Sequence, residues 1–277
     1  MRPLPAFLLA GFAVLSLSAC ASRHDVDHQV PKLAFAEEET ARFPVDIMQF
    51  PGPRSGLAGR TIKVGSIADL VLARNEVVLT FDDGPMPGKT PAILKTLDEH
   101  GVKATFLMVG QMARSYPALV KEVAARGHSI GTHTEHHANL ASIGFDRAVG
   151  EIDQGRKSVA AALVPTGMKA APFFRFPYLS DTPALRRHLA MQGVVVVDPT
   201  VDSKDYFVST PDQVRQRTVA RLEARGSGIV LFHDLHQRTV AMLPKLLDDL
   251  HARGFKVVHL APKQRAGGDL LVSALSE

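Results

Sequence analysis

The sequence predicts an α/β fold in which helices cover a parallel β-sheet. From Val77 onward, short runs rich in β-branched and aromatic residues alternate with amphipathic stretches of helical length. The run Val194-Val195-Val196-Val197 is apolar at every position, which is typical of a strand buried on both faces. Strict alternation of this kind produces either a barrel or an open doubly wound sheet, and the alternation alone does not choose between them.

The pattern accommodates seven strands and six helices. The strands are expected at residues 77–81, 105–109, 128–131, 173–176, 194–198, 229–233 and 255–260. Helices between them are expected to begin at a threonine followed by proline, as in Thr90-Pro91, Thr182-Pro183 and Thr210-Pro211. Helix ends are expected at glycines, which accept the left-handed backbone of a C-terminal cap: Gly101, Gly127, Gly193, Gly226 and Gly254. Residues 61–72 are expected to add a short strand or helix.

The N-terminal segment has the features of an export signal. Arg2 precedes an apolar run over residues 6–17, which has the length of a signal-peptide core and is too short to span a bilayer. Leu17-Ser18-Ala19-Cys20 resembles the lipobox of bacterial lipoproteins, which implies cleavage before Cys20 and lipidation of that cysteine. The alternative is a plain signal peptide with an incidental cysteine. We expect an exported protein of the bacterial cell envelope or periplasm, anchored to a membrane through Cys20.

The 277 residues are therefore expected to divide into a signal peptide (1–19), a tether and lead-in segment (20–74), a globular domain (75–262) and a C-terminal tail (263–277). A composition of 45% hydrophobic and 22% charged residues is that of a globular protein. The net charge of +4 is spread without a block of Lys or Arg, so no nucleic-acid partner is expected. Cys20 is the single cysteine, so a metal ion in the domain would have to bind His, Asp or Glu.

Polar residues suited to chemistry follow the ends of five predicted strands: Asp82 and Asp83, His133 and His137, Arg175 and Tyr178, Asp202 and Asp205, and His233 and Asp234. Both candidate architectures place their sites at the carboxyl ends of strands, so these side chains are expected on one rim. His133 and His137 are four residues apart, and one helical turn would put both rings on the same face. Two imidazoles and one carboxylate can form an open three-ligand metal site.

Each group taken alone also has an ordinary structural explanation. Asp82-Asp83-Gly84-Pro85 is a strong turn signal, a histidine pair is often only solvated, and His233 could be a hydrogen-bonded core residue. The spacing of Gly84 to Thr90 is similar to a phosphate-binding loop, but prolines remove amide donors there and two aspartates would repel a phosphate, so no nucleotide is expected. Two histidines and a carboxylate also describe a non-haem iron oxygenase.

Five segments resemble, in order, the motifs of the polysaccharide deacetylase family, also called carbohydrate esterase family 4 or the NodB-homology group. They are Thr80-Phe81-Asp82-Asp83-Gly84-Pro85, His133-Thr134-Glu135-His136-His137, Arg175-Phe176-Pro177-Tyr178, Asp202-Ser203-Lys204-Asp205-Tyr206 and Leu231-Phe232-His233-Asp234. The resemblance extends over about residues 77–260 and implies a distorted (β/α)7 barrel. One departure is Tyr206, because the family usually has an aromatic such as tryptophan there and this chain has no tryptophan.

The resemblance implies a role for each matching position. Asp83, His133 and His137 match the metal ligands, with zinc as the default ion and cobalt, nickel or iron as alternatives. His136 is a possible competing ligand, but adjacent helical positions point about 100° apart, so His137 is preferred. Asp82 matches the catalytic base, and Arg175 matches the arginine that orients it. Tyr178 matches the backbone oxyanion donor, and Leu231 matches a residue lining the acetyl pocket. His233 matches the general acid, with Asp205 as its acidic partner.

These positions imply a hydrolase that removes N-acetyl groups, or O-acetyl groups, from an envelope or extracellular polysaccharide. A base and an acid beside a metal suit hydrolysis better than oxygen chemistry. Peptidoglycan, chitin-type oligomers and poly-N-acetylglucosamine all present the same acetamide, and the sequence does not distinguish them. The rival interpretation is a catalytically silent glycan-binding envelope lipoprotein.

Overall fold

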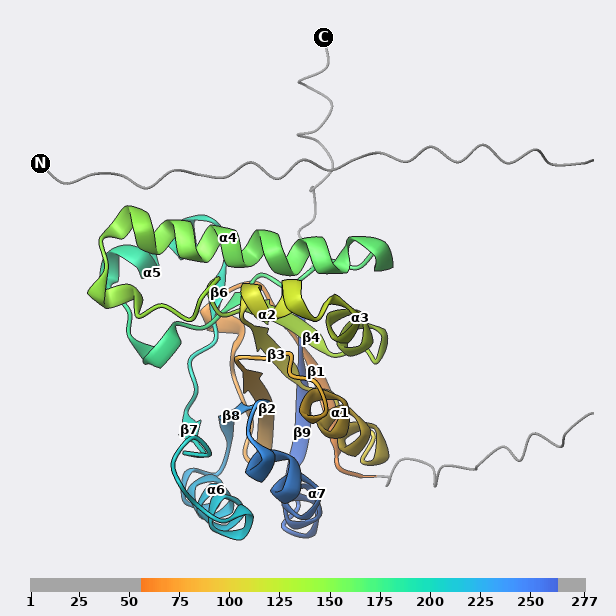
Figure 1. The fold of residues 1–277 in the computed structure, drawn as a ribbon. Helices are drawn as coiled ribbons and strands as arrows, with labels where there is room; N and C mark the ends of the chain where they lie inside the picture. Colours follow the sequence, from red (N-terminus) through yellow and green to blue (C-terminus); the bar gives the residue numbers. More distant parts are fainter. Residues whose placement is uncertain (1–55, 264–277) are drawn as a thin grey trace, which may run out of the picture. The chain divides into compact units, whose positions relative to one another are not determined.

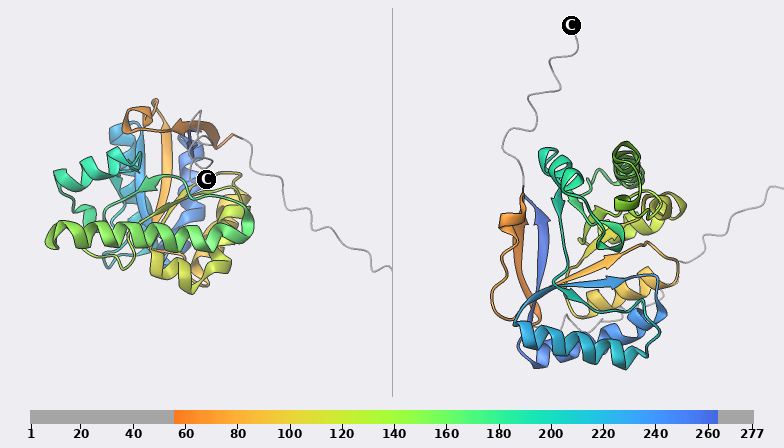
Figure 2. Two further views of the ribbon diagram at one scale, coloured as in Figure 1. Left: turned by 90° about the horizontal axis from the view of Figure 1, so that it is seen from above. Right: turned by 90° about the vertical axis from the view of Figure 1, so that its left-hand side faces the viewer.

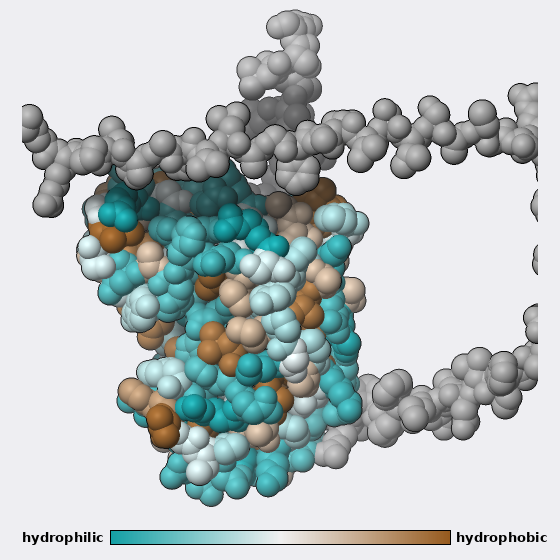
Figure 3. Space-filling view, in the orientation of Figure 1, coloured by the Kyte–Doolittle hydropathy of each residue, from teal (hydrophilic) through white to brown (hydrophobic). Residues whose placement is uncertain are grey.

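The computed structural model describes residues 56–263, which all belong to the unit Met48–Glu277 (Figure 1). The predicted signal peptide, Cys20, residues 20–55 of the predicted tether and lead-in segment, and the tail after Lys263 lie outside the described residues. None of the described helices is long and apolar enough to cross a membrane. On the face in Figure 3, hydrophilic residues predominate and hydrophobic ones are scattered among them.

The described chain alternates strands with helices. The strands are β1 (Ala58–Val64), β2 (Glu76–Asp82), β3 (Thr105–Met108), β4 (Ser129–Thr132), β5 (Phe173–Phe174), β6 (Val195–Val196), β7 (Val201–Asp202), β8 (Gly228–His233) and β9 (Lys256–Pro262). The helices are α1 (Lys89–Glu99), α2 (Gly110–Ser115), α3 (Pro117–Ala125), α4 (Phe145–Leu163), α5 (Pro183–Met191), α6 (Pro211–Arg225) and α7 (Gln237–Ala252). Short 3₁₀ turns lie at Ile67–Asp69, Leu140–Ser142, Val164–Thr166 and Pro177–Leu179.

All strand pairs of the sheet are parallel, as the sequence predicts. Hydrogen bonds connect the strands in the path β7-β8-β2-β3-β4-β5-β6, and β9 with β1 attaches to the first residues of β2. β1 and β9 lie side by side at one edge in Figure 2. The sheet is not closed, because no hydrogen-bonded pairing of the described strands joins β6 and β7.

The strands have apolar side chains on both faces because the sheet has a core on each side. One cluster, which includes Val78, Leu107 and Phe173, lies on the face covered by β1 and β9. The cluster containing Phe81 and Phe106 packs on the opposite face, against α1, α3 and α7. A third cluster lies under α4 and α5. The parallel α/β class expected from the continuous apolar runs is therefore confirmed.

The register of the strands places Asp82 and His233 side by side at one end of the sheet. β2 and β8 pair over six residues, from Val77↔Gly228 to Asp82↔His233. On its other side, Asp82 pairs with Leu107 of β3. A one-residue slip in a strand would turn its side chains to the opposite face. The buried apolar residues that precede Asp82 in β2 therefore fix the register, and with it the position of Asp82.

Several details differ from the sequence prediction. β7 is additional to the expected strands. The short element expected within residues 61–72 is present as the end of β1 and the 3₁₀ turn at Ile67–Asp69, but β1 begins earlier, at Ala58. One expected helix is divided into α2 and α3, because Pro117 begins a new helix directly after Tyr116. Thr90 is not a helix cap, since α1 begins at Lys89 after Gly88.

Other local predictions are confirmed. The hydroxyl groups of Thr182 and Thr210 accept hydrogen bonds from the N–H groups of Leu185 and Gln213, so both threonines cap their helices. All five glycines expected at helix ends have positive φ, between 66° and 81°.

Candidate metal centre and active site

A cavity of about 330 Å³ lies at the carboxyl ends of β2, β4 and β8. Most of the predicted site residues line it, together with residues that the sequence analysis did not single out. The lining residues are Asp82, Asp83, His133, His137, Phe176, Tyr178, Leu179, Asp202, Tyr206, Leu231, His233 and His236. The expectation that distant strand ends meet on one rim is therefore confirmed.

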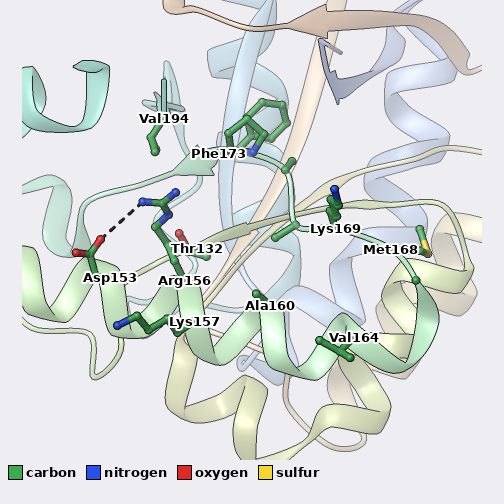
Figure 4. Close-up of a pocket in the computed structure, with 14 residues that line it drawn as sticks. Thr132, Asp153, Arg156, Lys157, Ala160, Val164, Met168, Lys169, Phe173 and Val194 are labelled. Carbon is green, nitrogen blue, oxygen red and sulfur yellow. Dashed lines mark ion pairs between the residues drawn. The ribbon is translucent and has the colours of Figure 1, made fainter. Parts of the chain in front are cut away.

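A larger cavity of about 810 Å³ lies elsewhere, between α4 and the starts of β5 and β6 (Figure 4). Arg156, Lys157 and Lys169 provide its positive charge, and Arg156 pairs with Asp153 at 3.7 Å. None of the predicted site residues lines this cavity. Size alone therefore does not identify the site.

Asp83, His133 and His137 bring one ligand atom each to a common point. The Asp83 Oδ1 atom lies 3.2 Å from Nε2 of His137 and 3.5 Å from Nε2 of His133, and the three ligand atoms all lie within 4.8 Å of one another. The Asp83 Oδ1 atom is buried, yet it has no hydrogen-bond partner among residues 56–263. A buried carboxylate oxygen without a donor, facing two imidazole nitrogens, fits a divalent cation.

The two histidines do not lie on a helix, so that part of the prediction is wrong. β4 ends at Thr132, and residues 133–139 form a loop in which Thr134 and His137 have φ of 64° and 57°. The loop turns both rings toward Asp83 even though no helical turn connects them. His136 has its imidazole 2.8 Å from the Glu151 carboxylate on α4, and it is not part of the Asp83 cluster.

Left-handed backbone at non-glycine residues is concentrated around this cavity. Asp83 has φ of 76°, and Tyr178 and Leu179 have φ of 59° and 53°. Such conformations cost free energy and persist only where the surrounding structure imposes them, which is common at functional sites.

The hydrogen bonds of His133 determine which nitrogen faces Asp83. Its Nδ1 lies 2.7 Å from the carbonyl oxygen of Arg175, which can only accept, so Nδ1 carries the proton. The Nε2 lone pair is then directed to the cluster. Burial lowers the pKa of His133, despite the nearby Asp82 and Asp83 charges, and favours the neutral ring that binds a metal.

Arg175 connects the metal cluster with Asp82. Its side chain is fully buried and donates from Nη1 to Asp82 Oδ1 at 2.7 Å and to Thr80 Oγ1 at 2.8 Å. Its Nε donates to the carbonyl oxygen of Val197 at 2.7 Å. The buried Asp82 carboxylate therefore has a cationic partner, and the rigid guanidinium orients it.

His233 and Asp205 form a second pair on the other side of the cavity, in which Asp205 is buried and His233 is partly buried. His233 Nδ1 lies 2.7 Å from Asp205 Oδ1, and the other Asp205 oxygen accepts from the His233 N–H and the Thr239 hydroxyl. Burial opposes protonation of His233, but Asp205, with Asp82 and Asp83, outweighs it and raises the pKa of His233 to about 9. His233 is therefore protonated at neutral pH, as a general acid requires.

The remaining predicted residues complete the walls. Leu231 is buried on β8, and Tyr178 is exposed with its ring edge-on to His137 at a centroid distance of 4.6 Å. The Tyr178 N–H donates to no other residue in the described part of the chain. Tyr206 donates from its hydroxyl to Asp202 and lies edge-on to His233.

Sequence reasoning missed two kinds of residue. His236 lines the cavity beside His233, with ring centroids 5.8 Å apart, and its place three residues after a motif histidine was an available signal. The Thr80 hydroxyl accepts a hydrogen bond from Arg175, and the Thr239 hydroxyl donates one to Asp205. A single threonine in a strand or a helix has no sequence pattern that would indicate such a role.

A parallel α/β sheet that brings a two-histidine, one-carboxylate cluster between an oriented carboxylate and a protonated imidazole has the arrangement of a metal-assisted hydrolase. The comparisons with known proteins agree with this class. The chain belongs to the polysaccharide deacetylase family, whose sequence model matches residues 71–197.

Two curated relatives show how similar the chain is to known members of the family. The chain is 30% identical to a chitooligosaccharide deacetylase of Sinorhizobium fredii, over 65% of this chain and 87% of that protein. It is 32% identical to a peptidoglycan-N-acetylglucosamine deacetylase of Listeria monocytogenes, over 66% of this chain. The match spans 37% of the length of that Listeria protein.

Solved structures share the fold. A peptidoglycan deacetylase of Bdellovibrio bacteriovorus superposes with a TM-score of 0.65 and 35% sequence identity, over 76% of this chain and 58% of that chain. The family and the parallel α/β fold implied by the five motifs are therefore confirmed.

Proposed function

We propose that this protein is a metal-dependent deacetylase that hydrolyses N-acetyl groups on an envelope polysaccharide. The observation that supports it most directly is the convergence of Asp83, His133 and His137 between two separate ion pairs, Asp82–Arg175 and Asp205–His233. A solvated histidine pair or a simple turn needs neither of these pairs. Amide hydrolysis needs one group to take a proton and another to return it.

Asp83, His133 and His137 would hold the metal ion, with zinc as the default for an open site of two imidazoles and one carboxylate. When bound, a divalent ion supplies Lewis acidity, which polarises the acetyl carbonyl and lowers the pKa of water. The three side chains contribute no proton transfer of their own, so that task falls to the neighbouring pairs.

Asp82 accepts the proton of the attacking water, and Arg175 orients its carboxylate through the hydrogen bond from Nη1. The free Tyr178 N–H donates to the oxygen that becomes negative in the tetrahedral transition state. His233 then donates a proton to the leaving amine, while Asp205 holds the imidazolium by its Nδ1. Leu231 contributes the apolar wall for the acetyl methyl group.

The substrate proposal rests on the relatives. Their names cover peptidoglycan, chitin and chitooligosaccharides, which share N-acetylglucosamine. We include O-acetyl esters, because the same water attack cleaves them. The proposed location is the cell envelope, with a lipid anchor at Cys20 tethering the domain to a membrane near such a polymer.

Acetate release from a panel of peptidoglycan fragments, chito-oligosaccharides and O-acetylated glycans tests the activity. We expect release from at least one N-acetylated glycan, loss of release with a chelator, and recovery when zinc is added back. Asp82→Asn is the matched control, since it keeps the shape of the side chain but removes the base. Glycan binding without acetate release under any metal would instead identify a silent binding protein.

A further inference from the structure

The loop that carries both candidate histidine ligands is held from behind by a buried glutamate. Glu135 lies midway between His133 and His137 and is 1% exposed. Its carboxylate pairs with Nη2 of Arg114 on α2 at 2.6 Å and accepts a hydrogen bond from the Ser158 hydroxyl of α4 at 2.8 Å. Burying a carboxylate is costly without such partners, so the two contacts determine where Glu135 can sit.

The backbone of this loop is tied to the same two helices. The first two N–H groups of α2, from Gly110 and Gln111, donate to the carbonyl oxygens of Thr134 and Glu135 at 2.9 and 3.0 Å. The Glu135 N–H donates to the carbonyl oxygen of Glu151 on α4 at 3.0 Å. These bonds satisfy the free donors at the start of α2 and join the loop to both helices, which pack together in Figure 1.

Two glycines make room for this arrangement. A Cβ atom at Gly110 would lie 2.1 Å from the Glu135 carboxylate, and one at Gly155 would lie 2.5 Å from the carbonyl carbon of Thr134. Neither distance is possible for a real side chain. The close approach of α2, α4 and the loop therefore depends on the absence of side chains at both positions.

We propose that Glu135, held by Ser158 and Arg114, is a positioning residue that sets the convergence of His133 and His137 on a metal ion. The left-handed φ values of Thr134 and His137 need an external restraint, and Glu135 lies between these two residues. Glu135 itself is not among the atoms that cluster around Asp83. This inference rests on the metal centre of the proposed function.

The test measures zinc affinity directly on the full purified chain, by competition with a chromophoric chelator. Glu135→Ala is expected to weaken zinc binding by about 10- to 100-fold, the usual effect of losing a group that orients a metal ligand. Glu135→Gln keeps the shape and one acceptor, so it should recover most of that affinity. Ser158→Ala should weaken binding in the same direction by a smaller factor.

Glu122→Ala is the matched control, because Glu122 lies on α3 and pairs with Arg126 just after that helix, away from the loop. It is expected to leave zinc affinity unchanged. Cobalt-substituted protein gives a second readout, since an altered ligand geometry changes the visible absorption bands. Arg114→Ala, at a half-exposed position, replaces Glu135→Ala if that variant does not fold.

The outcomes separate the two proposals. If the wild-type chain binds no zinc, the metal centre of the proposed function fails. If the wild type binds zinc and the Glu135 and Ser158 variants bind it equally well with unchanged cobalt spectra, the positioning role is wrong. A lowered melting temperature without a change in zinc affinity would show that Glu135 serves only the stability of the fold.

Discussion

Replacing Asp205 by asparagine should move the pH dependence of the reaction through His233. Asp205 is fully buried and accepts hydrogen bonds from both Nδ1 and the backbone N–H of His233. The difference between the ordinary pKa of 6.5 and the value of about 9 corresponds to about 3 kcal/mol of preference for the protonated ring. Burial lowers the pKa of His233 and Asp205 is the main group that raises it, so loss of the Asp205 charge should lower this pKa, although the weaker effects of Asp82 and Asp83 remain.

The assay is the pH dependence of kcat/KM on an N-acetylated chito-oligosaccharide. In the wild type, activity should fall on the alkaline side near pH 9, as His233 loses its proton. In Asp205→Asn the fall should move to lower pH, because the main group that raises the pKa of His233 is gone. Titration of isotope-labelled histidine by NMR measures the same pKa without turnover.

Asp202→Asn is the control, since Asp202 also lines the cavity but bonds Tyr206 and Lys204 rather than His233. It should leave the alkaline limb in place. An unchanged alkaline limb and an unchanged histidine titration in Asp205→Asn would refute the assignment of His233 as an acid tuned by Asp205.

The same pair predicts the pH dependence of stability. The pKa of His233 is higher in the folded chain than the ordinary value expected after unfolding. The stabilisation is therefore complete below about pH 6.5 and is lost as the pH rises through about 9. Chemical denaturation at pH 6 and pH 10 should show this loss in the wild type and not in Asp205→Asn.

Four further predictions concern the metal, the two proton transfers and the anchor. His137→Ala should lose bound zinc and activity while His136→Ala retains most of both; equal metal loss would contradict the ligand set. Asp82→Asn should retain zinc but lower kcat by about 100- to 10,000-fold, the usual contribution of a positioned base. His233→Ala should slow acetamide cleavage more than cleavage of an aryl acetate, whose phenolate leaves unaided; equal slowing would exclude His233 as the acid. Cys20→Ala should yield a soluble form with unchanged activity on small substrates, and retention on membranes after a salt wash would place the anchor elsewhere.

Tertiary contacts explain most of the differences between the predicted and observed elements. β7 consists of Val201 and Asp202 alone, and it exists because these residues pair with Val230 and Leu231 of β8. Thr90 precedes a proline, as a helix cap often does, but its hydroxyl instead donates to the buried Asp234 carboxylate at 2.5 Å. Neither partner is near in sequence, so no local pattern could have indicated the outcome.

The sequence by itself determined the parallel α/β class of the fold and indicated most of the residues that line the candidate site. Continuous apolar runs require a sheet covered on both faces, and parallel strands then bring their carboxyl ends, with Asp83, His133 and His233, to a common edge. The path of the chain after each strand was decided only by the tertiary structure. His133 and His137 converge through a strained loop rather than a helical turn, because α2 and α4 hold the residues between them. Spacing along the chain specifies which residues are available, whereas packing against distant helices sets the direction of each side chain.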